Sequence, residues 1–161
     1  MTPFEVQAVA VLVDNLDRVS LADEGVTSPT QVFPRILEGS DPTYSIGAYL
    51  TSWSAVDAPA LGGRDEPQIC RYTFGIQTFL KSAVRAEGER LSAVFVKRTR
   101  QMLYRDAVLR SQLSALSEVD DFTVERYLRH GLTATEYSDG SISGGFAFLS
   151  QAEFYIESEV T

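Results

Sequence analysis

Few side chains in this sequence have the type and spacing that catalysis requires. His130 is the only histidine and Cys70 the only cysteine. Arg71 adjoins the cysteine and could lower the pKa of its thiol, but a lone thiol is more often buried and inert. A lone histidine in a bend, here between Arg129 and Gly131, is more often a surface or capping residue than a general base. We therefore expect neither side chain to be catalytic.

Three carboxylates, Glu153, Glu157 and Glu159, fall on one face of a predicted strand. Paired carboxylates can perform acid–base chemistry or hold a hard cation. The same spacing is typical of the solvated face of an edge strand, where charge deters aggregation, and we favour that interpretation. The sequence has no zinc-ligand spacing, P-loop, dinucleotide fingerprint or Gly-x-Ser-x-Gly elbow. It therefore predicts a protein that is not an enzyme, with no catalytic residue, bound metal or cofactor.

Length and composition suit a single domain spanning residues 1–161. A chain of 161 residues with 44% hydrophobic residues can bury a substantial core. One cysteine excludes an internal disulfide and favours a reducing compartment. The N-terminus lacks the basic region of a signal peptide, and no apolar run approaches the ~20 residues needed to span a bilayer. We expect no membrane association.

Charge is distributed unevenly along the chain. The net charge is −8, which argues against broad adhesion to nucleic acids or anionic membranes. The stretch from Arg71 to Arg110 holds nine basic and three acidic residues, a net of +6, so the remainder carries −14. Such a chain could bind a copy of itself head to tail, in a ring or a filament. Compensation within one chain explains the same distribution equally well.

The basic stretch is predicted to be one strand followed by one long helix. Alternation over residues 72–80 indicates a strand, and residues 81–89 read as a polar connection in which Gly88 allows a turn. A helix follows, with Leu91, Val94, Phe95 and Met102 on one face. Arg98 falls inside that apolar stripe. It either reaches the edge of the core or pairs with an acid, or it marks a face that meets another chain.

The basic side chains of this helix and the acidic face of the last strand are the candidate subunit interface. On the helix face opposite the apolar stripe lie Arg90, Lys97 and Arg100, with Tyr104 beside them. The eight candidate residues are Arg90, Lys97, Arg98, Arg100, Arg105, Glu153, Glu157 and Glu159.

The other elements complete an α+β chain. A capped, largely buried helix is expected over residues 2–19, followed by a hairpin of strands 31–37 and 44–51, the first interrupted by Pro34. A long loop is expected over residues 53–67, and a short helix over 106–116. Three or four strands then close the chain, with a hairpin turn at 138–141. This order predicts a mixed, mainly antiparallel sheet with the N-terminal and central helices packed on it.

The pattern resembles the tail terminator (tail completion) proteins of long-tailed bacteriophages (siphoviruses), the group typified by the phage lambda tail terminator. Besides the capped N-terminal helix and the hairpin after it, the stretches that carry the resemblance are RYTFGIQTFLKS, EGERLSAVFVKRTRQMLYRD and AEFYIESEV. The resemblance covers most of the chain in element order, length and acidity. The segment 106–121 is an insertion relative to the shorter members.

The resemblance implies a virion structural protein that assembles in the host cytoplasm and resides at the tail–neck junction. The implied assembly is a hexameric ring that caps the tail tube, ends its polymerisation and joins it to the head–tail connector protein. Its implied partners are other copies of itself, the tail tube protein and the connector, while DNA passes through the lumen without specific binding.

Two other classes remain open from the residues alone. A neck or head–tail connector subunit, or another minor tail protein, would have similar length and acidity. A small-ligand-binding α+β domain is the third possibility, because aromatic residues on alternating strands could line a pocket. The aromatic residues in question are Trp53, Phe122, Tyr127, Phe146 and Phe148.

Overall fold

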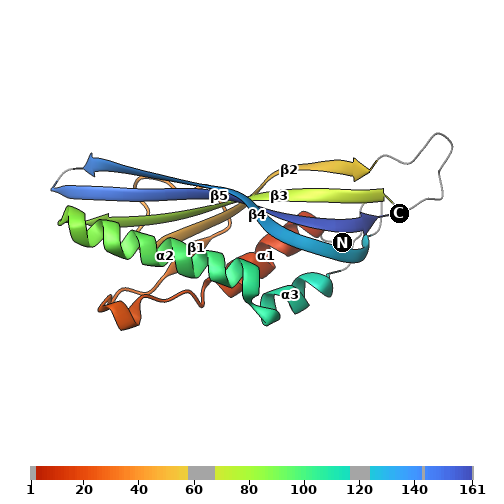
Figure 1. Cartoon of the computed structure of the whole chain (residues 1–161), viewed down its shortest axis with the longest axis horizontal. Coiled ribbons are helices and arrows are strands. Elements are labelled where there is room, and N and C mark those ends of the chain that lie inside the picture. The colour runs from red at the N-terminus through yellow and green to blue at the C-terminus, as the bar shows by residue number, and fades with distance from the viewer. Residues whose placement is uncertain (1–2, 58–67, 117–123, 143, 161) are drawn as a thin grey trace.

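A computed structural model describes residues 3–57, 68–116, 124–142 and 144–160. All three α-helices lie on one side of the sheet, and the molecule is elongated along α2 (Figure 1). The elements in chain order are α1 (Phe4–Leu16), a 3-10 turn η1 (Ala22–Glu24), β1 (Gln31–Phe33), β2 (Ser45–Asp57), β3 (Gln68–Ser82), α2 (Arg85–Arg105), α3 (Ala107–Ser114), β4 (Val124–Ile142) and β5 (Gly145–Val160).

The described strands form one sheet in the order β1-β2-β3-β5-β4. Every neighbouring pair is antiparallel except β1 with β2. The predicted α+β class, with an N-terminal and a central helix on a mixed, mainly antiparallel sheet, is confirmed. One cluster of buried side chains joins the helices to the sheet.

The predicted hairpin between strands 31–37 and 44–51 is wrong, because β1 runs parallel to β2. β1 ends before Pro34, and the segment 34–44 returns across the sheet surface facing away from the helices. There the backbone N–H of Leu37 donates to Oε1 of Gln77 at 2.9 Å. Gly47 leaves the room for this crossing, since a Cβ there would lie 2.6 Å from the carbonyl oxygen of Arg35. The crossing lets β1 and β2 run in the same direction.

The carboxylate of Asp41 stabilises the segment 34–44. Asp41 is buried and accepts hydrogen bonds from both Nη atoms of Arg35 at 2.7 and 2.9 Å. These bonds, with that from the Glu38 backbone N–H, lower the pKa of Asp41 to about 2.

The core lies between the helices and the inner face of β3 and β5. Alternate residues of both strands point toward the helices, as the period-two pattern predicts. The inner-face hydrophobic residues are Cys70, Tyr72, Phe74, Ile76 and Leu80 from β3, and Phe148, Ala152, Phe154 and Ile156 from β5. α1 contributes Phe4, Ala8, Leu12 and Leu16, and α2 contributes Leu91, Phe95 and Leu103.

The expected turn at Gly88 is wrong, because α2 begins three residues earlier and Gly88 lies within it. Gly88 is buried against Phe148 of β5, and a Cβ at this position would overlap the phenyl ring and meet Ser82 Cβ at 2.9 Å. The glycine therefore serves close helix–strand packing rather than chain reversal.

Three further boundaries differ from the sequence expectation. The predicted start of the long loop, at residue 53, is wrong, because β2 continues to Asp57 by pairing with β3. Residues 58–67 lie outside the described part. The three or four expected closing strands are two long ones. The hairpin turn predicted at 138–141 is wrong, because β4 continues to Ile142, which pairs with Gly145, and Gly144 has a positive φ (+80°) suited to a turn.

The helix starts and ends also shift slightly. α1 ends at Leu16 rather than near residue 19, and Pro3 is its N-cap residue without a side-chain hydrogen bond. The short helix predicted over 106–116 is observed as α3.

Replacing Gly88 by alanine tests the packing of α2 on β5. Alanine favours helix by ~1 kcal/mol relative to glycine, but the overlap with Phe148 is expected to cost more, giving a net destabilisation of ~1–2 kcal/mol. Chemical denaturation would measure it. The double variant Gly88→Ala/Phe148→Leu should recover part of the loss, whereas Gly39→Ala, with no atom near its added Cβ, should leave stability unchanged. Equal stability of Gly88→Ala and the parent protein would contradict the packing argument.

Candidate functional site

The basic side chains of α2 divide between two sides of the helix. On the side facing η1, the guanidinium of Arg98 donates to both carboxylate oxygens of Asp23 at 2.6 and 2.9 Å and to the carbonyl oxygen of Ser20 at 2.6 Å. Arg90 donates to Glu24 at 2.6 Å and to Glu87 of its own helix at 2.8 Å. These two arginines therefore compensate acids of the same chain.

The pKa values agree with this pairing. The hydrogen bond from Arg98 lowers the pKa of Asp23, and that from Arg90 lowers the pKa of Glu87. Arg98 thus follows one alternative of the sequence analysis, reaching from the apolar stripe to an acid of its own chain. To bind another subunit it would first have to release these carboxylates.

A second junction, which the sequence analysis did not identify, joins α1 to α3. Arg18 donates to both carboxylate oxygens of Asp106, at 2.7 and 3.0 Å. Asp106 also caps α3 by accepting a hydrogen bond from the backbone N–H of Leu109 at 2.9 Å. The hydrogen bond from Arg18 is the larger cause, and that from Leu109 the smaller, of a lowered pKa of Asp106. The available signal was an aspartate directly before an apolar helical stretch, a common N-cap pattern.

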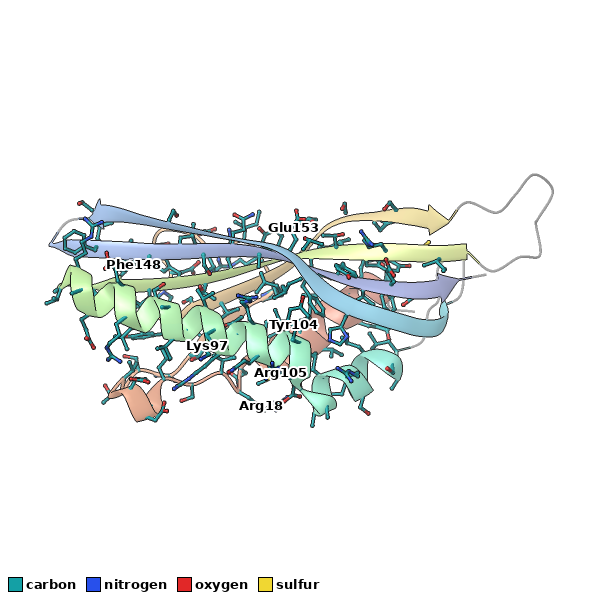
Figure 2. All side chains as sticks on the ribbon, in the orientation of Figure 1. Arg18, Lys97, Tyr104, Arg105, Phe148 and Glu153 are labelled. Atoms are coloured by element: carbon teal, nitrogen blue, oxygen red, sulfur yellow. The ribbon has the colours of Figure 1, made fainter. Side chains whose placement is uncertain are left out.

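Three other cations of α2 are not compensated within the described residues. Lys97, Arg100 and Arg105 are exposed, and none forms an ion pair within the described ranges. With Gln101 and Tyr104 they line a shallow groove of about 380 Å³. Figure 2 shows Lys97, Tyr104 and Arg105 along this helix. We call Lys97, Arg100 and Arg105 the basic strip.

Tyr104 shows which way the basic strip faces. Its hydroxyl oxygen lies 3.2 Å from the backbone N of Leu132 and 3.4 Å from the carbonyl oxygen of the same residue in β4. Lys97 and Arg100, which share a groove with Tyr104, therefore border the β4 edge of the molecule. Arg105 also borders a second groove, on the side of Arg98.

Glu153 and Glu157 of β5 do not form a cluster. β5 is flanked by β3 and β4, so the expectation that it is an edge strand is wrong. Glu157 is buried and accepts from Arg71 at 2.6 Å, while Glu153 is exposed ~13 Å away along the strand. Glu153 lies on the sheet surface opposite the helices (Figure 2). The side chain of Glu159 lies outside the described part.

His130 and Cys70 are not brought together. Cys70 is fully buried, and burial raises the pKa of its thiol. His130 is on β4, two strands away and ~10 Å or more across the sheet, with its ring 5.4 Å from that of Phe154. Burial, followed by the positive charge of Arg110, lowers the pKa of His130. The buried thiol agrees with the expectation for Cys70. The expectation that His130 is a surface or capping residue in a bend is wrong, because it lies half-buried in β4 with its ring against Phe154.

The aromatic residues proposed as a pocket lining do not converge. Phe148 is in the core beside Gly88, and Phe146 follows it toward the β4–β5 turn. Trp53 pairs with Tyr72, while Phe148 pairs with Leu80, eight residues or ~26 Å farther along β3. Phe122 and the side chain of Tyr127 lie outside the described residues. The described aromatic residues therefore do not form one ligand site.

The described residues contain no group of three or more His, Cys, Asp or Glu side chains arranged to hold a metal ion. Among the helices in these ranges, none combines the length and apolar character needed to cross a bilayer.

Comparisons with known proteins give a structural likeness. No protein-family model matches the sequence, and no curated protein matches it. The chain is similar to a chain in a solved structure of the virion of the native gene transfer agent (GTA) particle, with 14% identity and a TM-score of 0.43. The match covers 94% of this chain and 93% of the other. At that score and identity, we draw no functional argument from it.

The depressed pKa of His130 predicts a pH-dependent stability. Protonation is favoured in the unfolded chain, where the pKa is ~6.5, over the folded one. Stability is therefore fully present above that pH and falls as the pH drops through it toward the lower folded pKa. The melting temperature measured from pH 7.5 to 5.5 should decrease, and His130→Gln should flatten the decrease. An unchanged slope in His130→Gln would show that another group titrates in this window.

Arg98→Ala should reduce stability slightly and leave assembly intact, because its bonds go to the segment 20–24 of the same chain. The measurements are a denaturation midpoint and the sedimentation of the folded variant. Asp23→Ala, which removes the main partner, should have a similar effect, and the double variant should add little more. Loss of assembly by folded Arg98→Ala would instead place Arg98 in a subunit interface.

Proposed function

We propose that this chain is a virion structural subunit, a tail terminator that forms a ring on the end of the tail tube. The observation that carries the proposal is the basic strip. In a protein of net charge −8, Lys97, Arg100 and Arg105 stay exposed without an acidic partner in the described ranges, whereas Arg90 and Arg98 are compensated locally. A cationic face on an acidic chain suits an acidic neighbour, including another copy of itself.

The order of elements supports the same proposal. Of the features on which the resemblance to tail terminators rests, the N-terminal helix, the long central strand, the basic helix and the long closing strand are present. The expected hairpin after the first helix is replaced by the parallel pair β1 and β2. In the proposed assembly, a hexameric ring stops tube growth and presents its opposite surface to the head–tail connector. DNA passes through the lumen without being read, as suits a chain with net negative charge.

The proposed residence of the subunit follows from this role. It would assemble in the host cytoplasm and remain in the virion at the tail–neck junction. The partners are then copies of the chain itself, the tail tube protein and the connector protein.

Binding to the end of the tail tube tests the function directly. The purified protein is added to tubes polymerising from the tail tube protein of the same virus, and tube length is followed by electron microscopy. A terminator should appear as a ring at one tube end and stop elongation in proportion to its concentration. Binding to portal-filled heads but not to tubes would identify a connector instead, and binding to neither would overturn a role in the tail.

A further inference from the structure

The two lateral edges of the molecule differ in a way that makes them complementary. At one edge, α1 packs beside β1 and β2. At the other, α2 reaches β4 through the contact between Tyr104 and Leu132. Each edge has an open strand, an adjoining helix face and a shallow groove. The charged side chains at the borders of the two helix faces have opposite signs.

The α1 edge is apolar with acidic rims. Its groove, of about 570 Å³, is lined mainly by Val6, Val9, Ala10 and Val13 of α1 and by Tyr49 and Leu50 of β2, with Glu5 and Asp14 at its borders. Val6 is 53% exposed. The fully buried face of α1 is supplied by other residues, from Phe4 to Leu16. Val9 and Val13 are partly buried against that core, and their remaining surface faces the groove. We call this surface the α1 groove.

The α2 edge is apolar with basic rims. Ala93 and Val96 line a groove of about 630 Å³ together with Lys97 and Arg100 of the basic strip. Glu89 also borders it, but its carboxylate already accepts from Arg85 at 3.1 Å. Neither Lys97 nor Arg100 here, nor Glu5 nor Asp14 at the α1 groove, forms an ion pair within the described residues.

The described sheet also has an unpaired strand edge on each side of the molecule. β1 covers only Ser45 to Gly47 of β2. Beyond Gly47, no described strand pairs with the outer edge of β2, and β4 is the open strand on the other side. Unpaired strand edges are exposed rows of hydrogen-bonding groups that favour association with another chain.

We infer that the α1 groove of one copy binds the basic strip side of α2 in the next copy, with the β2 edge and the β4 edge side by side. Glu5 and Asp14 face Lys97 and Arg100 in this contact, and the small apolar residues of the two helices pack between them. The contact is heterologous, since two different surfaces meet, so repeating it gives a ring where the rotation between copies closes. The inference deepens the proposed ring-forming function and rests on it for the closed assembly.

The inferred contact differs from the one expected from sequence in its acidic partner. The sequence alone predicts that the acidic side of the subunit interface consists of Glu153, Glu157 and Glu159. Glu157 is committed to Arg71 within its own chain, whereas Glu5 and Asp14 lie beside exposed apolar surface. An interface core needs apolar area as well as charge at its rim, and the α1 groove has both.

Charge reversal with compensation tests this contact. One variant carries Lys97→Glu/Arg100→Glu, a second carries Glu5→Lys/Asp14→Lys, and a third combines all four changes. Sedimentation velocity over a range of protein concentration should show that each two-site variant self-associates about tenfold or more weakly than the parent. The four-site variant, and an equimolar mixture of the two two-site variants, should recover assembly. Glu153→Lys, an exposed reversal on the sheet surface opposite the helices, should assemble normally.

The apolar part of the contact has its own variant. Val6→Asp should weaken assembly, whereas Val108→Asp, at an equally exposed valine of α3 (50%), should not. Circular dichroism and thermal melts confirm that every variant is folded. Normal assembly of either two-site variant, or failure of the folded four-site variant to recover, would overturn the inferred contact. So would a parent protein that remains monomeric at every concentration and salt.

The same proteins separate this inference from the proposed function. If the parent caps tail tubes and both two-site variants still form rings, the interface assignment is wrong and the terminator role stands. If the rings follow the charge-reversal pattern but bind no tube end, the interface is correct and the terminator role is wrong.

Discussion

The structure depends on the antiparallel pairing of β3 with β5. The two strands remain in register from Gln68↔Val160 to Ser82↔Phe146, which creates an inner face ~50 Å long that water must not reach. α2, with 21 residues, extends only ~31 Å and cannot cover it alone. α1 therefore covers the end near Tyr72, where the ring of Phe4 lies 4.6 Å from that of Tyr72. The helix order follows from this division of the sheet.

Close approach of helix to sheet requires a glycine at one point. Gly88 places the first turns of α2 directly on Phe148, and the groove between them is filled by the phenyl ring. Similar pairs occur on the opposite sheet surface, where the ring of Tyr49 lies over Gly75 and that of Tyr155 over Gly131. In each case an aromatic ring packs against a glycine within a helix or strand. The missing side chain, and not the backbone freedom of glycine, therefore explains why glycine occupies the position.

Charge in this protein is divided by the position of α2. One side of the helix meets η1, and the acids there bind Arg90 and Arg98. The other side faces the β4 edge and keeps its cations exposed. Both interpretations of the charge distribution are therefore represented, compensation within the chain on one side and a candidate surface for another chain on the other. Because exposed ion pairs contribute little to stability, retaining an uncompensated strip costs the fold little.

The sequence by itself determined the elements whose pattern is strong. Alternation identified β3 and β5, helical spacing identified α1 and α2, and together they determined the α+β class, since each pattern leaves one apolar face that must be covered. The basic helix was also evident, because charge is a property of composition. These features are local, and local spacing records them directly.

Tertiary structure alone decided which neighbours each element met. The parallel pairing of β1 with β2 depends on the crossing over Gly47, the position of Gly88 within α2 depends on Phe148, and the continuation of β4 to Ile142 depends on its register with β5. The partner of Arg98 and the isolation of Lys97 likewise depend on where residues 20–24 return to α2. These contacts join residues far apart in the chain, so spacing along the sequence does not encode them.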